Sequence, residues 1–423
     1  MNFSAFRSLT AFALAIALPL GAACDTDTSE SEPDGPSVED PPPDTEPDPK
    51  PQSCPVPTQG PTIHKAGAIE ADETWAADAS PHIVEGFIAV RKATLTIEPC
   101  AVVQFDGIYA GLTIAYPGSP TTGSIVAEGT ADLPIRFEGL DGARWGHVLV
   151  EAGGTARFAH VTMSDGGGYD PRGASLIVYG GSTLPVRRDV FADHLTIERS
   201  LGTGVVLGRL GTFTDDSDAL VVTESGSADK LAFPVTTDEH GMLGLPRGTF
   251  TGNLDDRIYI DPERRLSVSG TMKNPGVPYK IGSFGDDDFV VGAGEENGLV
   301  TLTIEPGTEI EMHAGTAFKI EHYTGPFAAS GAVVAEGTEA APIVFRSAAD
   351  APAAGDWQGL AFGGIARTEN SFKHVRLEHT GAWCGCILTG CSAIDEYEGA
   401  IIFSQEPARA FFEDSVVANG SGH

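Results

Sequence analysis

Apolar and polar residues alternate in short runs along most of the chain, and the runs end at Gly, Pro or Asp. Thr94–Ile97 alternates, and Pro99 ends that run because proline has no N–H to give to a strand ladder. Ser124–Ala127 and Ile135–Phe137 follow, with a turn at Gly129 between them. Short runs with a period of two predict β-strands, and the spacing of amphipathic helices is missing after the N-terminus. The pattern therefore predicts an all-β fold.

The other predicted strands have the same form. In the first half of the chain they are Trp145–Val150, Phe158–Met163, Ser175–Tyr179 and Phe191–Ile197. In the second half they are Ile258–Ile260, Leu266–Val268, Phe289–Val291, Leu302–Ile304, Val333–Ala335, Ile343–Phe345, Leu360–Phe362, Phe372–Leu377, Ile401–Phe403 and Phe412–Val417. A strand spacing on the order of 8–12 residues is compatible with a sandwich, a barrel or a β-solenoid.

The chain repeats its own segments in the same order. The pairs are TLTIEPC (Thr94–Cys100) with TLTIEPG (Thr301–Gly307), GSIVAEGTADLPIRF (Gly123–Phe137) with GAVVAEGTEAAPIVF (Gly331–Phe345), and FAHVTM (Phe158–Met163) with FKHVRL (Phe372–Leu377). Collinear repeats of short strands are typical of coils that stack on their neighbours and bury a continuous core. The sequence therefore favours a β-solenoid over a sandwich or barrel.

These repeated segments resemble the right-handed parallel β-helix repeat proteins. That is the pectin-lyase-like fold, in the form common in tethered bacterial surface lipoproteins, and Thr74–Val90 resembles their opening coil. The resemblance implies a right-handed parallel β-helix (β-solenoid) in two echoing modules, residues 63–226 and 227–423. The second copy stops within a coil at Val416–His423, so we expect this module to be truncated or its open coil to be covered by another chain.

The N-terminus has the form of an export signal. Met1–Arg7 is positively charged, and Leu9–Leu20 is apolar but too short to span a bilayer core of roughly 30 Å. LPLGAAC, which ends at Cys24, resembles a bacterial lipobox, although its leucine lies four residues before the cysteine instead of three. We expect residues 1–23 to be a signal peptide and Cys24 to carry fatty chains that anchor the protein in a membrane. Secretion with cleavage near Ala23 is the alternative.

Residues 24–62 are rich in Asp, Glu, Pro and Ser. Such a composition cannot bury enough apolar surface to offset its conformational entropy, so we expect a disordered acidic Pro-rich linker. A stalk of this kind fits a cell-envelope lipoprotein at the outer membrane or surface of a Gram-negative bacterium. The formal net charge of the chain is -33, which repels nucleic-acid phosphates and argues against a nucleic-acid partner.

Five cysteines other than Cys24 are candidates for disulfides, because an exported protein occupies an oxidising compartment. They are Cys54, Cys100, Cys384, Cys386 and Cys391. A Cys54–Cys100 bridge would hold the end of the linker against an early coil. Cys384 or Cys386 would pair with Cys391, and the alternative for these three is a structural zinc site completed by His379.

Clusters of aspartates are the candidate metal ligands, because calcium prefers several hard oxygens. The best placed are Asp286, Asp287 and Asp288, on a bend before a strand; Asp215, Asp216, Asp218, Asp255 and Asp256 form two further clusters. Solvated turns are the alternative for each cluster. The resemblance implies either lyases with calcium-binding aspartates and an Arg or Lys base, or hydrolases with paired aspartates beside Gly-His-Gly and Arg-x-Lys, and the sequence completes neither set.

Three functions follow from these patterns. We expect a non-enzymatic envelope lipoprotein that presents its β-helix surface to a polysaccharide or a surface protein. A calcium-assisted polysaccharide lyase or glycoside hydrolase is the second hypothesis, and a structural spacer is the third. His160 and His374 occupy matching places, which we interpret as outward-facing strand positions, and the matching Trp145 and Trp357 are interpreted as residues that close a coil.

Overall fold

The computed structural model describes residues 53–116, 122–283, 287–292, 298–321, 327–381 and 399–421. The chain divides into two compact units, residues 1–50 and 51–423, and the second unit is described here. The predicted signal peptide, Cys24, most of the predicted linker, Asp286 and the three C-terminal cysteines lie outside the described residues. Within these ranges, no helix has the length and apolar character needed to cross a membrane.

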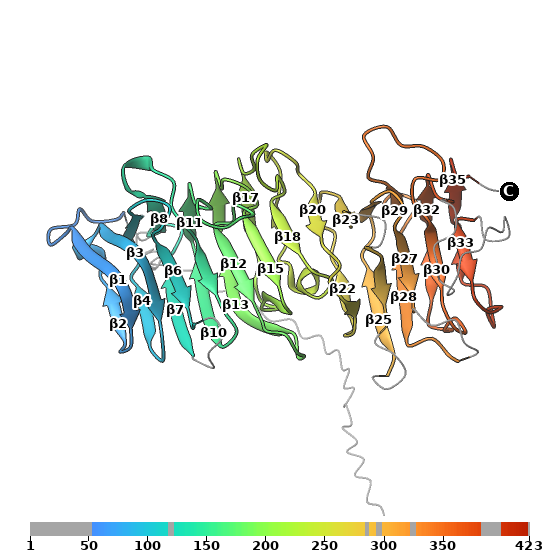
Figure 1. The fold of residues 1–423 in the computed structure, drawn as a ribbon, viewed down its shortest axis with the longest axis horizontal. Coiled ribbons are helices and arrows are strands. Elements are labelled where there is room, and N and C mark those ends of the chain that lie inside the picture. The colour runs from blue at the N-terminus through green and yellow to red at the C-terminus, as the bar shows by residue number, and fades with distance from the viewer. Residues whose placement is uncertain are drawn as a thin grey trace, which may run out of the picture. The chain divides into compact units, whose positions relative to one another are not determined.

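Every strand pairing among the described residues is parallel. Strands of successive coils lie side by side along the unit, as Figure 1 shows. The chain folds as a right-handed parallel β-helix, and the predicted fold class is confirmed. Its described helices are the short 3-10 turns η1 (Ala77–Ala79), η2 (Leu140–Gly142) and η3 (Gly241–Gly244).

Each coil of the first half contributes one strand to each of three stacks. The first stack contains β5 (Val102–Phe105), β8 (Ile135–Gly139), β11 (Val161–Ser164), β14 (Thr196–Glu198), β17 (Leu220–Thr223) and β19 (Gly248–Thr249). The second contains β6 (Gly111–Ile114), β9 (Val148–Val150), β12 (Leu176–Tyr179), β15 (Val205–Gly208), β18 (Val235–Thr237) and β20 (Ile258–Ile260). The third contains β2 (Glu73–Trp75), β4 (Thr94–Ile97), β7 (Gly123–Glu128), β10 (Gly154–Ala159), β13 (Arg187–Asp193) and β16 (Gly211–Phe213).

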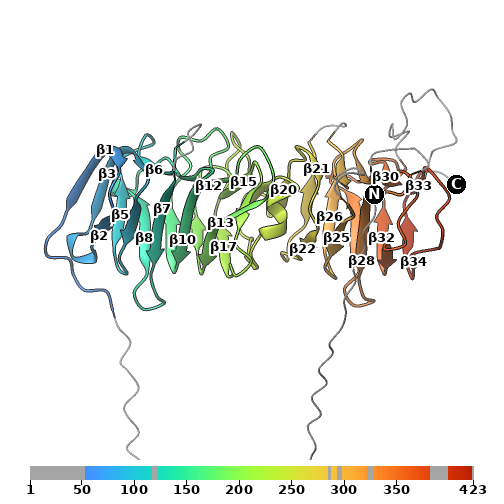
Figure 2. The same cartoon turned by 90° about the horizontal axis from the view of Figure 1, so that it is seen from below.

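The long opening strands β1 (Thr62–Ile69) and β3 (His82–Val90) start both the first and the second stack, because the two ends of β3 pair with β5 and β6. In the second half, the second stack continues through β23 (Tyr279–Ile281), β26 (Glu309–Met312), β29 (Ile343–Ser347), β32 (Val375–Glu378) and β35 (Val416–Ala418). A fourth stack contains β21 (Arg265–Leu266), β24 (Phe289–Val291), β27 (Ala317–Ile320), β30 (Gly359–Phe362) and β33 (Ile401–Phe403). A fifth, seen with the others in Figure 2, contains β22 (Gly270–Met272), β25 (Val300–Ile304), β28 (Gly331–Glu336), β31 (Ser371–Lys373) and β34 (Phe412–Glu413).

The core runs along the inside of the stacks. In the first stack, the inward residues Val103, Phe137, Met163, Ile197 and Val222 face one another in register, and each has 0% exposure. Stacking places each apolar side chain against its counterpart one coil away, so burial is continuous from coil to coil. This ladder of inward side chains is the physical reason why apolar and polar residues alternate in the sequence.

The two sequence copies do not occupy the same stacks. Residues 227–257 still extend the first copy, since β18 pairs with β15 and β19 pairs with β17. In the next coil, β20 pairs with β18 of the second stack, and β23 and β26 continue this stack. Because β26 repeats the sequence position of β5, which lies in the first stack, the second copy is displaced by one strand position around the coil.

Four predicted strands are each two strands that meet at a sharp corner. Positive φ angles at His160 (47°), His194 (52°), His374 (47°) and Asp414 (47°) separate β10 from β11, β13 from β14, β31 from β32, and β34 from β35. The left-handed region is uncommon outside glycine but is enriched in His, Asp and Asn. His160 and His374 therefore form the turn itself instead of lying within a strand, whereas the residues expected to face inward beside them, Val161, Met163, Val375 and Leu377, are buried.

Trp145 and Trp357 are fully buried and close equivalent coils. The Trp145 indole N–H donates to the Ser164 carbonyl at 2.6 Å, and that of Trp357 donates to the Glu378 carbonyl at 2.8 Å. Both acceptors lie one coil further along the chain. Each tryptophan thus fills the core and joins two coils.

The end of the predicted linker packs against the first coils. Cys54 and Cys100 form a disulfide, which was one of the pairings that the sequence left open. The Thr58 amide donates to an Asp78 carboxylate oxygen at 2.7 Å. Residues 53–61 are therefore held in place, although the sequence analysis assigned them to the disordered linker.

Candidate ligand-binding surface

The outward face of the second stack is partly covered by a loop. Ile177 and Val206 point outward in register on β12 and β15, yet they are only 2% and 1% exposed. Ala174 packs on them from the segment between β11 and β12, residues 165–174, which we call the 165–174 loop. This loop fixes what the surface presents to solvent.

Backbone hydrogen bonds fasten the 165–174 loop to the coils on both sides. The Gly167 and Gly168 amides donate to the carbonyls of Gly146 and Trp145 at 2.7 Å each, one coil back. The Leu201 amide donates to the Gly166 carbonyl at 3.0 Å, one coil forward. Gly167 has a φ of 86°, and a Cβ there would lie 2.0 Å from the Gly173 carbonyl oxygen, so this close approach requires glycine.

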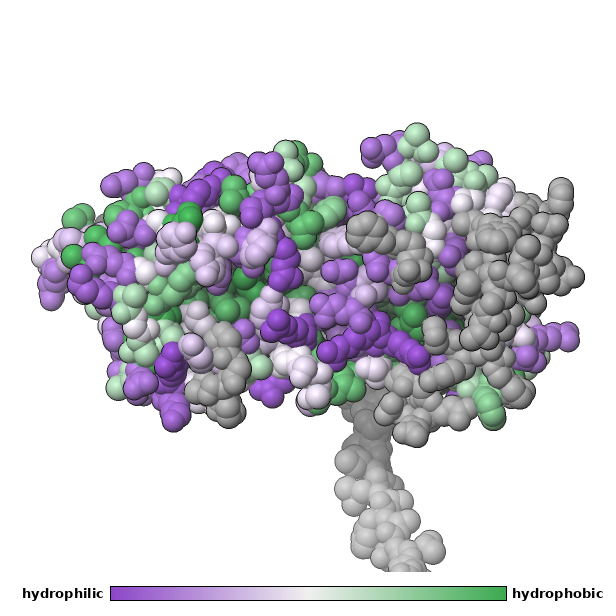
Figure 3. All heavy atoms as spheres, viewed as in Figure 1, coloured by the Kyte–Doolittle hydropathy of each residue, from purple (hydrophilic) through white to green (hydrophobic). Residues whose placement is uncertain are grey.

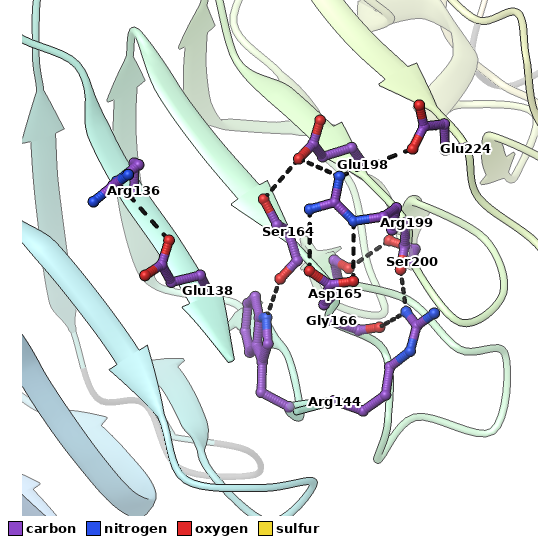
Figure 4. Close-up of polar contacts among 12 residues, drawn as sticks. Arg136, Glu138, Arg144, Ser164, Asp165, Gly166, Glu198, Arg199, Ser200 and Glu224 are labelled. Carbon is purple, nitrogen blue, oxygen red and sulfur yellow. Dashed lines mark hydrogen bonds and ion pairs between the residues drawn. The ribbon is translucent and has the colours of Figure 1, made fainter. Parts of the chain in front are cut away.

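An ion-pair network holds the base of the loop (Figure 4). The Arg199 guanidinium donates twice to the Asp165 carboxylate, at 3.1 Å each, and contacts Glu198 at 2.6 Å. Arg144 reaches across from the preceding coil to the carbonyls of Gly166 and Arg199. The hydrogen bonds that Arg199 donates to Asp165 are the main reason why the pKa of Arg199 is raised. A bidentate Arg–carboxylate pair gives geometric definition as well as attraction.

The Asp165–Arg199 pair of this network is not repeated in the sequence of the second copy. Asp165 and Arg199 have φ angles of 65° and 54°, and the second copy has the same left-handed corners at His379 and Asn419. The corner backbone is therefore shared, whereas the charged pair is not, because His379 and Asn419 stand where the first copy has Asp165 and Arg199.

The loop presents an aromatic patch together with its neighbours. Tyr169 meets Tyr109 edge to face, with ring centroids 5.8 Å apart, and these two rings are 51% and 67% exposed. Below them, Phe87 lies 5.0 Å and His147 5.8 Å from the Tyr169 ring. We call Phe87, Tyr109, His147 and Tyr169 the aromatic patch. Two exposed tyrosines on a rigid support make this patch a candidate interaction surface, since each ring is apolar and its hydroxyl is polar.

His147 lies under this patch in an apolar setting. The residue is 6% exposed, and its Nδ1 atom has no hydrogen-bond partner. Burial lowers the pKa of His147 to about 4, because a charged ring would lose its hydration, and the nearby Asp170 opposes this shift only partly. The ring is therefore neutral at pH 7 and leaves one polar nitrogen without a partner beneath the two tyrosines.

A polar pocket of 110 Å³ lies next along the same face. Arg172 of the 165–174 loop, Tyr179 and Arg209 form one side, and Asp238, Asp261 and Glu263 form the other. The Arg172 guanidinium donates to the Tyr179 hydroxyl, and the Arg209 guanidinium lies 4.5 Å from the centre of the Tyr179 ring. On the face seen in Figure 3, hydrophobic and hydrophilic residues are interspersed.

The pocket carboxylates have raised pKa values. Burial raises the pKa of Asp261, and the charges of Asp287 and Glu263 add to the effect. Burial followed by the charge of Glu239 also raises the pKa of Asp238. Perturbed carboxylates beside arginines in a pocket are typical of functional sites. Asp238 is also structural, since it accepts hydrogen bonds from the Gly241 and His240 amides at 2.6 and 3.0 Å.

The predicted calcium ligands already have partners within the protein. Asp287 accepts hydrogen bonds from the amide and hydroxyl of Ser283, at 3.1 and 2.9 Å. Asp288 accepts from the Ala317 amide at 2.7 Å and pairs with the buried Lys319 ammonium. Asp286 lies outside the described residues, so a calcium site at Asp286–Asp288 stays a prediction.

The other two acidic clusters hold turns and surface pairs. Asp255 pairs with Arg257 at 2.5 Å, and Asp256 accepts the Asn253 amide at 2.7 Å. Asp215 lies 3.3 Å from Arg188. The fold does not bring these clusters to the pocket, but it does bring Asp287 near Asp261.

Comparison with known proteins agrees with the architecture. Residues 294–385 match a family model described as a pectate-lyase like beta helix domain, and the match spans β25 to β32. No curated protein and no solved structure matches the chain. The match supports the parallel β-helix class and assigns no activity.

Tyr109, His147, Tyr169, Arg172 and Arg209 were not predicted from the sequence as residues of the candidate site. They come from four separate segments, and only the coil register brings them together. One signal was available in the sequence: DGGGYDPR (Asp165–Arg172) combines three glycines with Tyr and Arg between two predicted strands. A loop this rich in glycine beside aromatic and cationic residues is typical of a binding loop.

Proposed function

We propose that the protein is a non-enzymatic polysaccharide-binding protein of the cell envelope, and that the outward face of the second stack binds the glycan. The observation that carries the proposal is the exposed pair Tyr109–Tyr169, formed where the 165–174 loop meets the segment between β5 and β6, beside the Arg172/Arg209 pocket. The apolar C–H faces of sugar rings stack on exposed aromatic rings, and guanidinium groups donate to sugar oxygens. The surface offers both in adjacent positions.

The support beneath this surface suits rigid binding. Ion pairs from Arg199 and backbone bonds to two coils fix the loop, so little conformational entropy would be lost when a ligand binds. The glycan we expect is neutral or weakly charged, since a chain of formal net charge -33 repels polyanions.

We further propose that the protein is exported and held in a bacterial membrane by lipid on Cys24. The support is the apolar run Leu9–Leu20 followed by LPLGAAC, with the acidic residues 25–52 as a stalk. Such an anchor would present the β-helix at an envelope surface, where polysaccharides and surface proteins are the available partners.

The pocket favours one second candidate, a polysaccharide lyase or hydrolase. Asp261 has a raised pKa and lines a pocket with Arg172 and Arg209, and an acid–base pair of this kind is what glycan cleavage needs. The polysaccharide-binding proposal rests on the exposed Tyr109 and Tyr169, whereas the enzyme candidate rests on Asp261 and its neighbouring arginines. Substitutions in these two groups of residues therefore distinguish the two functions.

The test screens immobilised glycans and measures the dissociation constant of the best binder for the wild type, Tyr109→Ala and Tyr169→Ala. We expect each substitution to weaken binding at least tenfold, about 1.4 kcal/mol. Tyr116→Ala is the matched control, because this tyrosine is 46% exposed at the other end of β6 and stacks with Arg91 outside the patch. Affinities that are unchanged in the patch variants would refute the proposal.

The same glycan is then incubated with the wild type and Asp261→Asn, and new chain ends are counted. The binding proposal predicts no new ends in either sample. Turnover by the wild type that disappears in Asp261→Asn would establish the enzyme candidate instead.

A further inference from the structure

A second cluster of chemistry-bearing side chains lies at the corner between the third and first stacks, away from the proposed glycan surface. The chain turns from β10 to β11 at His160 and, one coil later, from β13 to β14 at His194. Because neighbouring strands lie about 4.8 Å apart, the same corner in two coils places one side chain over the other. The two imidazole rings stack, with centroids 4.6 Å apart and an interplanar angle of 17°.

A carboxylate completes the cluster. Asp193 is the last residue of β13, and its Oδ1 atom lies 2.8 Å from Nδ1 of His194. One ligand atom from each of His160, Asp193 and His194 can be chosen so that all three lie within 4.8 Å of one another. The side chains of Asp193 and His194 are 39% and 60% exposed, so the cluster is open to solvent ions.

We propose that His160, Asp193 and His194 form a binding site for Zn²⁺. Two imidazoles and one carboxylate are a ligand set that zinc takes, with Zn–N and Zn–O bonds of about 2.0–2.2 Å. Bonds of this length need ligand atoms about 3.3 Å apart, so atoms that now lie within 4.8 Å of one another must approach. The two stacked rings must also turn so that their nitrogens point at one ion, which the exposed His194 side chain permits. Zinc would then replace the proton between His194 and Asp193 and join two coils, with its remaining position open to water.

The second copy offers a natural comparison. His374 forms the same corner with the same φ of 47°, within the same F-x-H-V segment. The corner one coil later is Asp414 instead of a histidine, and Lys373 lies 3.7 Å from both Glu336 and Glu413. A single imidazole beside an ammonium group is a poor zinc site, so His374 is the matched control.

The experiment titrates ZnCl2 into the full chain by calorimetry, after treatment with EDTA and its removal. The variants are His160→Asn, His194→Asn and His374→Asn. Asparagine is chosen because it tolerates the left-handed backbone at all three corners, which keeps the fold comparable. Since the chain also contains cysteines and other histidines, the readout is the change between variants, with circular dichroism to check that each variant is folded.

We expect the wild type to bind one equivalent of zinc that is lost, or weakened at least tenfold, in both His160→Asn and His194→Asn and kept in His374→Asn. Binding that is unchanged in the two first-copy variants would overturn the proposal, as would an equal loss in all three variants. The proposal stands or falls independently of the glycan surface, since the two sites share no residue.

Discussion

At the residue scale, the protein places side chains where their conformation and burial are unusual. Histidines and aspartates take the left-handed corners between stacks, where most side chains are strained. Two tryptophans in matching positions donate to the next coil while filling the core. His147 is buried without a partner for Nδ1, under two exposed tyrosines. Each of these features is locally unfavourable or restricts the conformation of the chain, and the packing of the stacked coils holds it in place.

His147 predicts a dependence of stability on pH. The folded ring has a pKa of about 4, whereas an unfolded histidine titrates near 6.5, so the unfolded state binds more protons between these values. The stability contribution of neutral His147 is therefore complete above about pH 6.5 and decreases as the pH falls toward 4, by about 3 kcal/mol. His64 and His82 have pKa values lowered by burial, and they act in the same direction.

The measurement compares the midpoints of thermal unfolding at pH 7.5 and 4.5 for the wild type and His147→Phe. We expect the phenylalanine variant, which has no proton to gain, to lose less stability between the two pH values. An identical loss in both proteins would show that His147 does not titrate in this window.

At the element scale, the repeated segments allowed the strands, their order and the solenoid class to be predicted, because one inward ladder repeats from coil to coil. The corners were missed although the sequence contains their signal. Phe158, Val161 and Met163 all point inward, and a single strand cannot place 158 and 161 on one face. This interruption of the alternation between Phe158 and Val161 marks the turn at His160.

The site could not be predicted in the same way. Tyr109, His147 and Tyr169 lie in different coils, and their convergence depends on loop paths and register that alternation does not encode. The displacement of the second copy by one strand position is equally invisible, since both copies have the same internal pattern. The sequence therefore predicted the coil itself. It did not predict the position of one copy relative to the other around the coil, or the loop that covers the second stack.

The Arg199 pair predicts the behaviour of the 165–174 loop. Arg199→Met keeps the aliphatic stem but removes the bonds to Asp165, so we expect a loss of about 1–2 kcal/mol, faster hydrogen exchange in residues 165–174 and weaker glycan binding. Arg376→Met is the control, because the exposed Arg376 side chain pairs with Glu378 within β32 of the second copy. Loop exchange that matches the control would contradict this role.

The Cys54–Cys100 disulfide leads to a prediction about what holds residues 53–61 against the first coils. Cys100 has a φ of 71°, close to the 77° of Gly307 in the second copy, so Cys54→Ser/Cys100→Gly removes the bond without straining the backbone. For a sequence separation of 46 residues, the loss of stability should reach at most about 4 kcal/mol. We expect the amides of Thr58 and Gln59, which donate to Asp78, to lose protection from hydrogen exchange.

Reduction of the wild-type protein should reproduce the behaviour of this double variant. Protection of Thr58 and Gln59 that survives both treatments would mean that the Asp78 contacts alone hold the segment.

At the scale of the whole molecule, a parallel β-helix offers long, rigid faces, and one of them carries aromatic and cationic side chains in a row. The second copy extends the coil but presents different residues on the continuing stack, since its strands are displaced by one position. We infer a division of labour in which the first copy binds and the second lengthens the solenoid. The proposed lipid anchor and acidic stalk would place this unit at the envelope surface.

The proposed lipid anchor can be tested by substitution of Cys24. We expect cells fed labelled palmitate to incorporate the label into the wild-type protein and not into Cys24→Ser, because acylation requires the thiol. The wild type should sediment with membranes, and the variant should not. An unlabelled wild type that is released in soluble form would favour ordinary secretion with cleavage near Ala23.

Hydrogen exchange with and without the best-binding glycan tests the central claim most directly, because it locates the ligand on the chain. The glycan-binding proposal predicts slower exchange in residues 106–111 and 165–174, around Tyr109 and Tyr169, and no change in residues 343–378 of the second copy. Protection in the second copy alone, or none in either region when the glycan is saturating, would contradict the proposal that this face binds polysaccharide.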